Sequence, residues 1–434
     1  MYIVLAFGLS ILAAPVASTP VAVEISSDSL ETVLLDERES AAETPPPGGT
    51  EVPYPTTPDW ENDLRIQVGG LQVADMNGDG RQDVVVGCYI SNSFPPYDDW
   101  RNFIYFNTGS GLEGSPSWAS DDQRSTGDIQ VALLNDDAFP DVFAANGGGS
   151  YDPSVIYFGG PNGPATTPGW LSTDSSWTNY ALPFDFDHDG DVDVVTANQG
   201  RSQDDPFRPI YIFESNAGVL PTTPAALSPE MSIQNFLAFG HLDDDEWEDL
   251  AVSKWANFES GVYRNDQGTL ESTTTWTTGD DDTDKGVAWA DVDDNGDQDL
   301  ALGHDPTLVY FNTDGTLGSP QTATGTFFGH AELRFEDIDL DGDPDLAEVH
   351  FANGKAQIYL NRGGVLDTAP TWTFDSSAVG TALAFGDIDG DGAPDLVVGN
   401  SGDPSVMVFM NRQKWLLVDG FESGNTDAWT TTVP

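Results

Sequence analysis

The chain has 434 residues, of which 72 are acidic and 15 are basic, so its formal net charge is -57. This balance argues against nucleic acid as a partner, because phosphate contacts need Lys and Arg, and against binding to an anionic membrane surface. Hydrophobic residues make up 38% of the chain, which is enough for a large core, and the single cysteine, Cys88, excludes an internal disulfide.

So many unpaired negative charges would drive a compact state apart. We therefore expect cations to be part of the folded protein. An adaptation to high salt is an additional cause that the composition leaves open.

Residues 1–18, MYIVLAFGLSILAAPVAS, form an apolar run that ends in small residues. This pattern is typical of a secretory signal peptide, although a basic segment at its start is missing, and it is short for a membrane span. We expect a secreted or cell-surface protein without a membrane span in the mature chain. Residues 19–53 are acidic and rich in Pro and Ser, which predicts a flexible linker.

One acidic unit recurs seven times in the remaining chain, and its last copy reads DIDGDGAPDLVVGN from Asp387 to Asn400. The final aspartates of successive copies lie 46 to 58 residues apart. A period of this length indicates a repeated supersecondary unit. These final aspartates are Asp83, Asp141, Asp193, Asp249, Asp299, Asp345 and Asp395.

Each unit contains four short segments with strand character, divided by Gly, Pro, Asn and Asp. In the last two copies these are ALAFG before the acidic loop, DLVVG after it, QIYLNRGG with an aromatic residue, and the more polar TAPTWTFD. Four such strands describe one blade of a β-propeller. We predict an all-β fold over residues 54–415, a seven-bladed β-propeller with four-stranded antiparallel blades, and a short tail over residues 416–434.

The two ends of this region predict how the ring closes. The last copy lacks a fourth segment, whereas YPTTPDWEND, ahead of the first copy, has the character of one. We predict that this N-terminal piece is the outer strand of the last blade, which would leave no open sheet edge at the seam.

The acidic loops follow the spacing D-x-[DN]-x-[DN]-G-x-x-D, which is similar to the first nine positions of an EF-hand loop. Side-chain oxygens at positions 1, 3, 5 and 9 and the backbone carbonyl at position 7 can converge on one hard cation, while Gly at position 6 allows the sharp turn. An oxygen-only ligand set favours calcium over zinc or copper. The pattern predicts about five calcium sites, with dissociation constants of ~10⁻⁴ to 10⁻³ M as in other extracellular modules.

Five copies keep the full pattern. Their predicted ligands, with position 7 contributing its carbonyl, are Asp75, Asn77, Asp79, Arg81 and Asp83; Asp185, Asp187, Asp189, Asp191 and Asp193; Asp291, Asp293, Asn295, Asp297 and Asp299; Asp337, Asp339, Asp341, Asp343 and Asp345; and Asp387, Asp389, Asp391, Ala393 and Asp395. The second copy has Leu133 and Ala138 at positions 1 and 6, and the fourth has His241 and Glu246. We expect these two loops to be empty or weak.

The repeats resemble the FG-GAP or VCBS repeats of integrin α-subunit propellers and of many secreted bacterial proteins, over roughly residues 54–415. The Phe-Gly pair survives at Phe239-Gly240 and Phe385-Gly386. The resemblance implies a calcium-stabilised seven-bladed propeller with its calcium loops on one face and ligands bound on the other. Members of this group range from adhesins and lectins to accessory domains of glycan-degrading enzymes, so the fold alone does not assign a function.

The scarce cations and histidines of the chain predict where a ligand binds. Lys254, His304 and His350 stand five residues beyond the final aspartates of their units, and Lys285 and His330 lie at the start of first strands. We expect them on the face opposite the acidic loops, as a site for an anionic or hydroxyl-rich ligand such as an acidic sugar. The alternative is that these polar residues only mark where strands meet water.

The sequence lacks a GxSxG or HExxH motif, so our first expectation is a non-catalytic, monomeric binding or adhesion module for an extracellular glycan or protein. A second possibility is a propeller-fold polysaccharide lyase or hydrolase, in which one of the three histidines named above acts as a base and Lys254 or Lys285 neutralises a uronate. A third is a purely structural surface protein without a saturable ligand.

Overall fold

The computed structural model describes residues 52–89, 99–147, 152–174, 176–200, 207–255, 258–280, 282–324, 330–376 and 378–413. They all lie within one compact unit, residues 47–434. The predicted signal peptide and tail, and almost all of the predicted linker, lie outside the described residues. Within these ranges, the structure has no helix of the length and apolar character that a membrane crossing requires.

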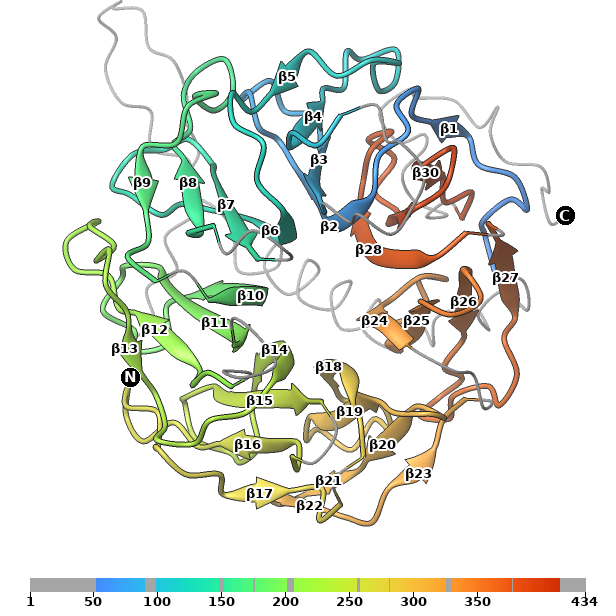
Figure 1. The fold of residues 1–434 in the computed structure, drawn as a ribbon. Helices are drawn as coiled ribbons and strands as arrows, with labels where there is room; N and C mark the ends of the chain where they lie inside the picture. Colours follow the sequence, from blue (N-terminus) through green and yellow to red (C-terminus); the bar gives the residue numbers. More distant parts are fainter. Residues whose placement is uncertain are drawn as a thin grey trace, which may run out of the picture. The chain divides into compact units, whose positions relative to one another are not determined.

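Seven four-stranded antiparallel sheets are arranged as the blades of a ring (Figure 1), which confirms the predicted seven-bladed propeller. In blade order, from the inner to the outer strand, they are β2 (Val68–Ala74), β3 (Asp83–Cys88), β4 (Phe103–Tyr105) and β5 (Trp118–Ala119); β6 (Thr126–Ala132), β7 (Asp141–Asn146), β8 (Val155–Tyr157) and β9 (Trp170–Leu171); β10 (Trp177–Phe184), β11 (Asp193–Gln199), β12 (Tyr211–Phe213) and β13 (Ala225–Ala226); β14 (Gln234–Gly240), β15 (Asp249–Lys254), β16 (Gly261–Tyr263) and β17 (Trp276–Thr277); β18 (Lys285–Ala290), β19 (Asp299–Gly303), β20 (Leu308–Tyr310) and β23 (Gln321–Thr322); β24 (His330–Glu336), β25 (Asp345–His350), β26 (Lys355–Tyr359) and β27 (Trp372–Asp375); and β28 (Gly380–Gly386), β29 (Asp395–Asn400), β30 (Val406–Phe409) and β1 (Trp60–Glu61). A small hairpin, β21 (Asn312–Thr313) and β22 (Thr316–Leu317), is added to blade five.

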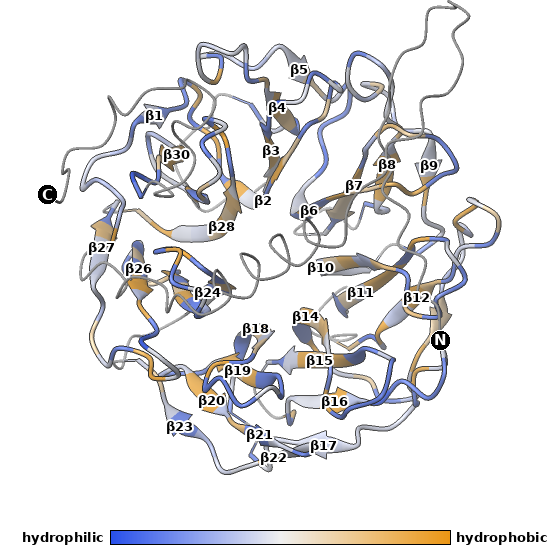
Figure 2. Ribbon diagram, turned by 180° about the vertical axis from the view of Figure 1, so that it is seen from behind, coloured by the Kyte–Doolittle hydropathy of each residue, from blue (hydrophilic) through white to orange (hydrophobic). Residues whose placement is uncertain are grey.

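The hydrophobic core is distributed between neighbouring blades. All six residues of β3, β7, β15, β25 and β29 are buried, and a strand covered on both faces appears in the sequence as a continuous apolar run such as DVVVGC. Figure 2 shows this hydrophobic character along β3 and β7. One cluster combines Val84 and Tyr105 of blade one with Val397 and Val408 of blade seven. Packing between blades therefore stabilises a sheet that would be marginal alone.

The N-terminal strand closes the ring, as predicted. β1 pairs with β30, with Trp60 opposite Val408 and Glu61 opposite Met407, and the two strands lie side by side in Figure 1. The buried Asn62 continues this seam, because its Oδ1 accepts hydrogen bonds from the backbone N–H groups of Ser405 and Val406, both at 2.9 Å.

We expect Asn62→Ala to destabilise the ring, since it leaves two buried N–H groups without an acceptor. The loss should be roughly 1–3 kcal/mol of the free energy of unfolding for each unmatched group. Thermal denaturation in saturating calcium measures it, with the exposed neighbour Glu61→Ala as the control. An unchanged melting temperature for Asn62→Ala would show that the seam does not limit stability.

Candidate metal centres

The turn between the first and second strands has one backbone shape in all five blades that keep the acidic pattern. Position 6 is a glycine with φ between 83° and 98° in each of these turns, and position 4 has φ between 55° and 79° even where it is His188, Asp294 or Leu340. Such left-handed angles favour glycine. Ala138 and Glu246, at position 6 of blades two and four, do not have these angles. The backbone conformation thus distinguishes the five turns that keep the acidic pattern from the two degenerate turns, as the sequence predicts.

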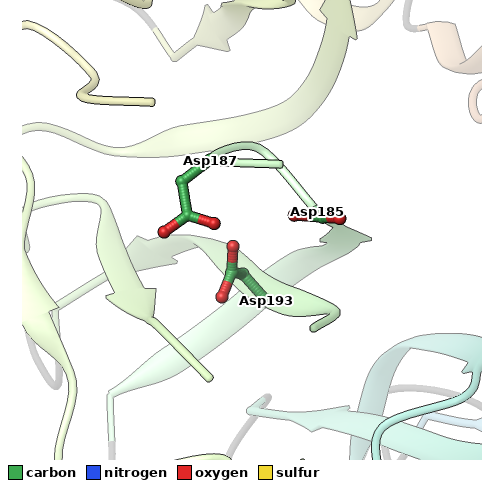
Figure 3. Close-up of side chains that lie close together, drawn as sticks. All are labelled: Asp185, Asp187 and Asp193. Atoms are coloured by element: carbon green, nitrogen blue, oxygen red, sulfur yellow. The ribbon is translucent and has the colours of Figure 1, made fainter. Parts of the chain in front are cut away.

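Four of these five turns bring three carboxylates together. In blade three one oxygen each of Asp185, Asp187 and Asp193 lies within 4.8 Å of the others (Figure 3). The first and third positions of the turn and the ninth, at the start of the second strand, contribute in every case. The other three groups are Asp291, Asp293 and Asp299; Asp337, Asp339 and Asp345; and Asp387, Asp389 and Asp395.

Several oxygens of these triads are buried without a hydrogen-bond partner. They are Asp185 Oδ1, Asp193 Oδ2, Asp337 Oδ1, both oxygens of Asp339, and Asp387 Oδ1. A buried carboxylate oxygen that no donor satisfies is costly. A cation between the three carboxylates would satisfy these atoms, so the four triads can hold metal ions, and an all-oxygen donor set suits a hard ion such as calcium.

Without a cation, burial keeps the final carboxyl group of each triad partly protonated. Burial is the main cause that raises the pKa of Asp345 to about 8 and that of Asp193 to about 7, and neighbouring carboxylates add to the effect. The pKa of Asp395 rises to about 7 and that of Asp299 to about 6 for the same reasons. The metal-free triads are therefore electrostatically strained at neutral pH.

The final aspartate of each turn also holds its own blade together. Asp345 Oδ1 accepts a hydrogen bond from the backbone N–H of Asn361, just past the third strand, at 2.7 Å, and its Oδ2 accepts one from Ile338 at 3.0 Å. The bond to the residue past the third strand occurs in all seven blades, including the two with degenerate turns. This aspartate is thus structural whether or not its turn can bind a metal.

In five blades, the residue whose backbone N–H bonds to this aspartate is an asparagine, and its side chain forms a hydrogen bond with the neighbouring blade. Asn361 of blade six donates its Nδ2 hydrogen to the carbonyl of Val292, at position 2 of the acidic turn of blade five, at 2.8 Å. Equivalent bonds join Asn107 to Ile388, Asn265 to Phe186, Asn312 to Leu242 and Asn411 to Ile338, at 2.6 to 2.9 Å. Blades two and three have Gly159 and Ser215 at this position. We did not predict this link, although the recurring Asn in segments such as QIYLNRGG signals it.

The remaining predicted ligands have other neighbours. Positions 5 of blades three, five, six and seven (Asp189, Asn295, Asp341, Asp391) lie outside the carboxylate triads. The side chains at position 7 accept backbone hydrogen bonds from the next turn of the same blade: Asp191 from Gly218 at 3.0 Å, Asp297 from Asp314 at 2.9 Å and Asp343 from Gly363 at 2.5 Å. These side chains are therefore occupied elsewhere, and the predicted ligand at position 7 remains its backbone carbonyl.

Blades one and four use arginine beside their acidic turns. In blade four the Arg264 guanidinium lies 2.5 Å from Asp243 and 3.4 Å from Asp245, at positions 3 and 5. In blade one Arg81 pairs with Asp79, and Asn77 stands at position 3 in place of a third carboxylate. The blade-one site, Asp75, Asn77, Asp79, Arg81 and Asp83, therefore remains a prediction.

The predicted ligand-binding side chains do not form one site. Lys254 is 2% exposed and its Nζ lies 2.9 Å from Glu230, and His350 is fully buried. His304 is bonded through Nδ1 to Asp284 at 3.0 Å, and the side chain of His330 lies outside the described residues. Among the four of these side chains that the structure describes, Lys285 lines an open cavity. The side chains of Lys254 and His350 are thus buried, since one residue along a strand reverses the direction of the side chain. Ligand binding by the five predicted residues remains a prediction.

Three comparisons bear on this geometry. Residues 337–398, which include the triads of blades six and seven, match the family model of the FG-GAP-like repeat. No curated protein sequence matches the chain.

Solved structures with a similar fold include two crystal structures of BBS1N in complex with ARL6DN, one soaked with lead and one with mercury. They have TM-scores of 0.54 and 0.53 at 13% identity, over 83% of this chain and 98% and 96% of those chains. At this identity the likeness shows the fold alone.

We expect Asn361→Ala to lower the free energy of unfolding by roughly 1–3 kcal/mol, because the buried carbonyl of Val292 loses its donor. Calorimetric titration should show unchanged calcium binding, since the triads keep their carboxylates. The exposed Asn216, beside Ser215 in the equivalent loop of blade three, provides the control as Asn216→Ala. Equal stability of the two variants would contradict a clamping role for Asn361.

We expect the metal-free protein to gain stability as the pH falls. The folded-state pKa values of Asp345 and Asp193, about 8 and about 7, lie above the ordinary value of 3.8. The folded state therefore binds protons that the unfolded state releases, and stability rises as the pH is lowered from about 8 towards 4. The melting temperature in chelator should increase from pH 8 to pH 6.

Saturating calcium should reverse this trend, because protons and the metal compete for the same carboxylates. A melting temperature in chelator that falls between pH 8 and pH 6 would argue against strained carboxylate clusters.

Proposed function

We propose that this FG-GAP-like propeller is a secreted, calcium-binding scaffold that acts as a non-catalytic binding or adhesion module for an extracellular glycan or protein. The observation that carries the proposal is the set of four aspartate triads at equivalent turns, three of which have buried oxygens that lack a hydrogen-bond partner. Calcium at these turns would stabilise the ring, and the opposite face would be free to bind a ligand.

Calcium suits the chemistry of the turns. Every triad offers carboxylate oxygens, and calcium accepts six to eight oxygen ligands in variable geometry, whereas magnesium demands a near-ideal octahedron. Partial neutralisation of the triads would also offset part of the formal charge of -57. Weak sites of this kind fill in extracellular fluid, where calcium is plentiful, which agrees with the export signal predicted over residues 1–18.

A binding role is favoured over the lyase or hydrolase alternative. That alternative needs a neutral histidine base beside the substrate, but His350 is fully buried, and the hydrogen bond to Asp284 raises the pKa of His304 and so favours its protonated form. The clustered carboxylates of the acidic turns have a role as metal ligands, so they do not count as a general acid and base. The structural-protein alternative differs by predicting no saturable ligand.

Calcium removal tests the scaffold. We expect calcium to raise the melting temperature and protease resistance of the full chain, because at a free concentration of 100 times the dissociation constant each site contributes about 2.7 kcal/mol. Asp187→Asn removes one carboxylate from the blade-three triad and should abolish one calcium site in calorimetry. Asp244→Asn makes the same charge change in the exposed turn of blade four, which has no triad, and should leave the stoichiometry unchanged.

Two results would overturn the proposed scaffold. One is a melting temperature that chelator does not change; the other is the same calcium stoichiometry in Asp187→Asn and wild type. An array of extracellular glycans and proteins, probed in calcium, tests the binding role separately: no saturable ligand would favour a structural protein.

A further inference from the structure

A cavity of about 500 Å³ opens at the end of the ring opposite the acidic turns. The acidic turn of each blade follows the end of the first strand and precedes the start of the second. The cavity is lined by the other ends of these strands, for example Val68 at the start of β2 and Tyr89 just past β3. Every blade contributes to it, from Gln67 of blade one to Thr381 of blade seven. Its volume is in the range of small-molecule sites.

A β-bulge in each first strand shapes the cavity. The register between the first and second strands shifts once in every blade, close to the start of the first strand. The residues inside these bulges that line the cavity are Gly69, Gly127, Asn179, Asn235, Phe236 and Thr381. Bulges re-aim side chains and are frequent next to functional sites. Seven bulges at one level of the ring point to a built site.

Aromatic side chains form the walls. Tyr89, Trp255 and Phe351 stand six residues beyond the final aspartates of their turns, one position after the residues predicted to face a ligand. Trp255 is 44% exposed and Phe351 45%, although both are large and apolar. Trp177 joins them, with its ring 6.2 Å from that of Tyr89. Exposed aromatic rings in a concave site offer flat apolar surfaces, on which the C–H face of a sugar ring can pack.

Lys285 supplies the charge of the cavity. It is the one charged side chain among the described lining residues. Its Nζ lies 5.0 Å from the ring centroid of Trp255 and 5.1 Å from that of Phe351, so two aromatic faces hold the ammonium in place. Burial lowers the pKa of Lys285, and an anion beside it would offset that cost. None of the other described lining residues is a carboxylate, so the cavity itself offers Lys285 no counter-charge.

Two polar atoms of the cavity wall also lack a protein partner among the described residues. Gln67 Oε1 and Thr381 Oγ1, on the adjacent blades one and seven, are buried and accept or donate no described hydrogen bond. Unmatched buried polar atoms are costly. One acceptor and one hydroxyl that line the same cavity suit the hydroxyl groups of a ligand.

We propose that this cavity binds one sugar ring that carries a carboxylate, of the hexuronate class. The ring would pack against Trp255 and Phe351, its carboxylate would pair with Lys285, and its hydroxyls would bond to Gln67 and Thr381. This assignment deepens the proposed binding function and rests on it. A neutral sugar would leave Lys285 without a counter-charge. A long polyanion would be repelled by the rest of the molecule, so the site would recognise a single unit or a chain end.

The test uses the full chain in millimolar calcium with four disaccharide probes: digalacturonate, dimannuronate, neutral cellobiose and a sulfated neocarrabiose. Isothermal titration calorimetry gives the affinities, at an ionic strength of about 0.15 M, where the Debye length is about 8 Å and long-range repulsion is screened. We expect the two uronates to bind saturably and cellobiose to bind at least about tenfold more weakly, because it lacks a charge that pairs with Lys285. The sulfated sugar tests whether the anion must be a carboxylate.

Substitutions of the residues that line the cavity identify those that bind the sugar. Lys285→Met should lower uronate affinity about tenfold or more and leave cellobiose unchanged, because it removes only the charge. Lys285→Arg should restore part of this affinity. Trp255→Ala should weaken the binding of all the sugars and reduce the ligand-induced change in tryptophan fluorescence, to which Trp177 also contributes. Lys355→Met is the matched control, since Lys355 does not line the cavity. Near-ultraviolet circular dichroism confirms that each variant is folded.

The outcomes separate this inference from the proposed function. If a glycan or protein on the array binds and calcium stabilises the ring, but none of the four disaccharides binds or Lys285→Met leaves uronate affinity unchanged, the cavity assignment is wrong and the scaffold stands. Equal binding of cellobiose or of the sulfated sugar would overturn the choice of a carboxylate. If calcium has no effect and nothing on the array binds, the proposed function itself fails.

Discussion

The carboxylate that ends each acidic turn is the group on which the rest of the ring depends. It is buried at the start of the second strand. In all seven blades it accepts a hydrogen bond from a backbone N–H group just past the third strand. In four blades it also completes a carboxylate triad. Burial alone would favour its neutral form, as the raised pKa of Asp345 shows. Hydrogen bonds from the backbone and a bound cation both stabilise its charged form, so blade geometry and metal binding share one side chain.

The repeat made the fold and the triads predictable from the sequence. The blades were predicted from the repeat period and from the four strand-like segments of each unit. Ring closure was predicted from the strand-like segment before the first copy. All of these are local patterns in the sequence. The inter-blade bond of Asn361 was missed, because its acceptor, Val292, lies 69 positions away. Lys285 of the cavity was predicted from the sequence, but the aromatic walls were missed because a strand alternates its side chains: Lys254 is buried in the blade, while Trp255 lines the cavity. The β-bulges shift this alternation of side chains. They were not predicted, because the bulged positions of this chain share no residue type.

The two ends of the ring are joined by short, rigid strands. Trp177, Lys285, Phe351 and Thr381 of the cavity come from blades three, five, six and seven, and these are the blades with carboxylate triads at their opposite ends. Order at one end of a hydrogen-bonded strand pair limits motion at the other. Blade four, which supplies Trp255, instead carries Arg264 beside its acidic turn, so a permanent side-chain cation stands where other blades have a triad.

The seam between β1 and β30 has a consequence for how the chain reaches its native state. Asn62 and its partner Ser405 are separated by 343 positions. The chain emerges from the ribosome with β1 first, so this strand must wait through the synthesis of six complete blades before its partner exists. The entropy of joining such distant segments grows only slowly with their separation, but the delay leaves an unpaired edge for the whole period. The ring of this protein can therefore close only after the last blade has been synthesised.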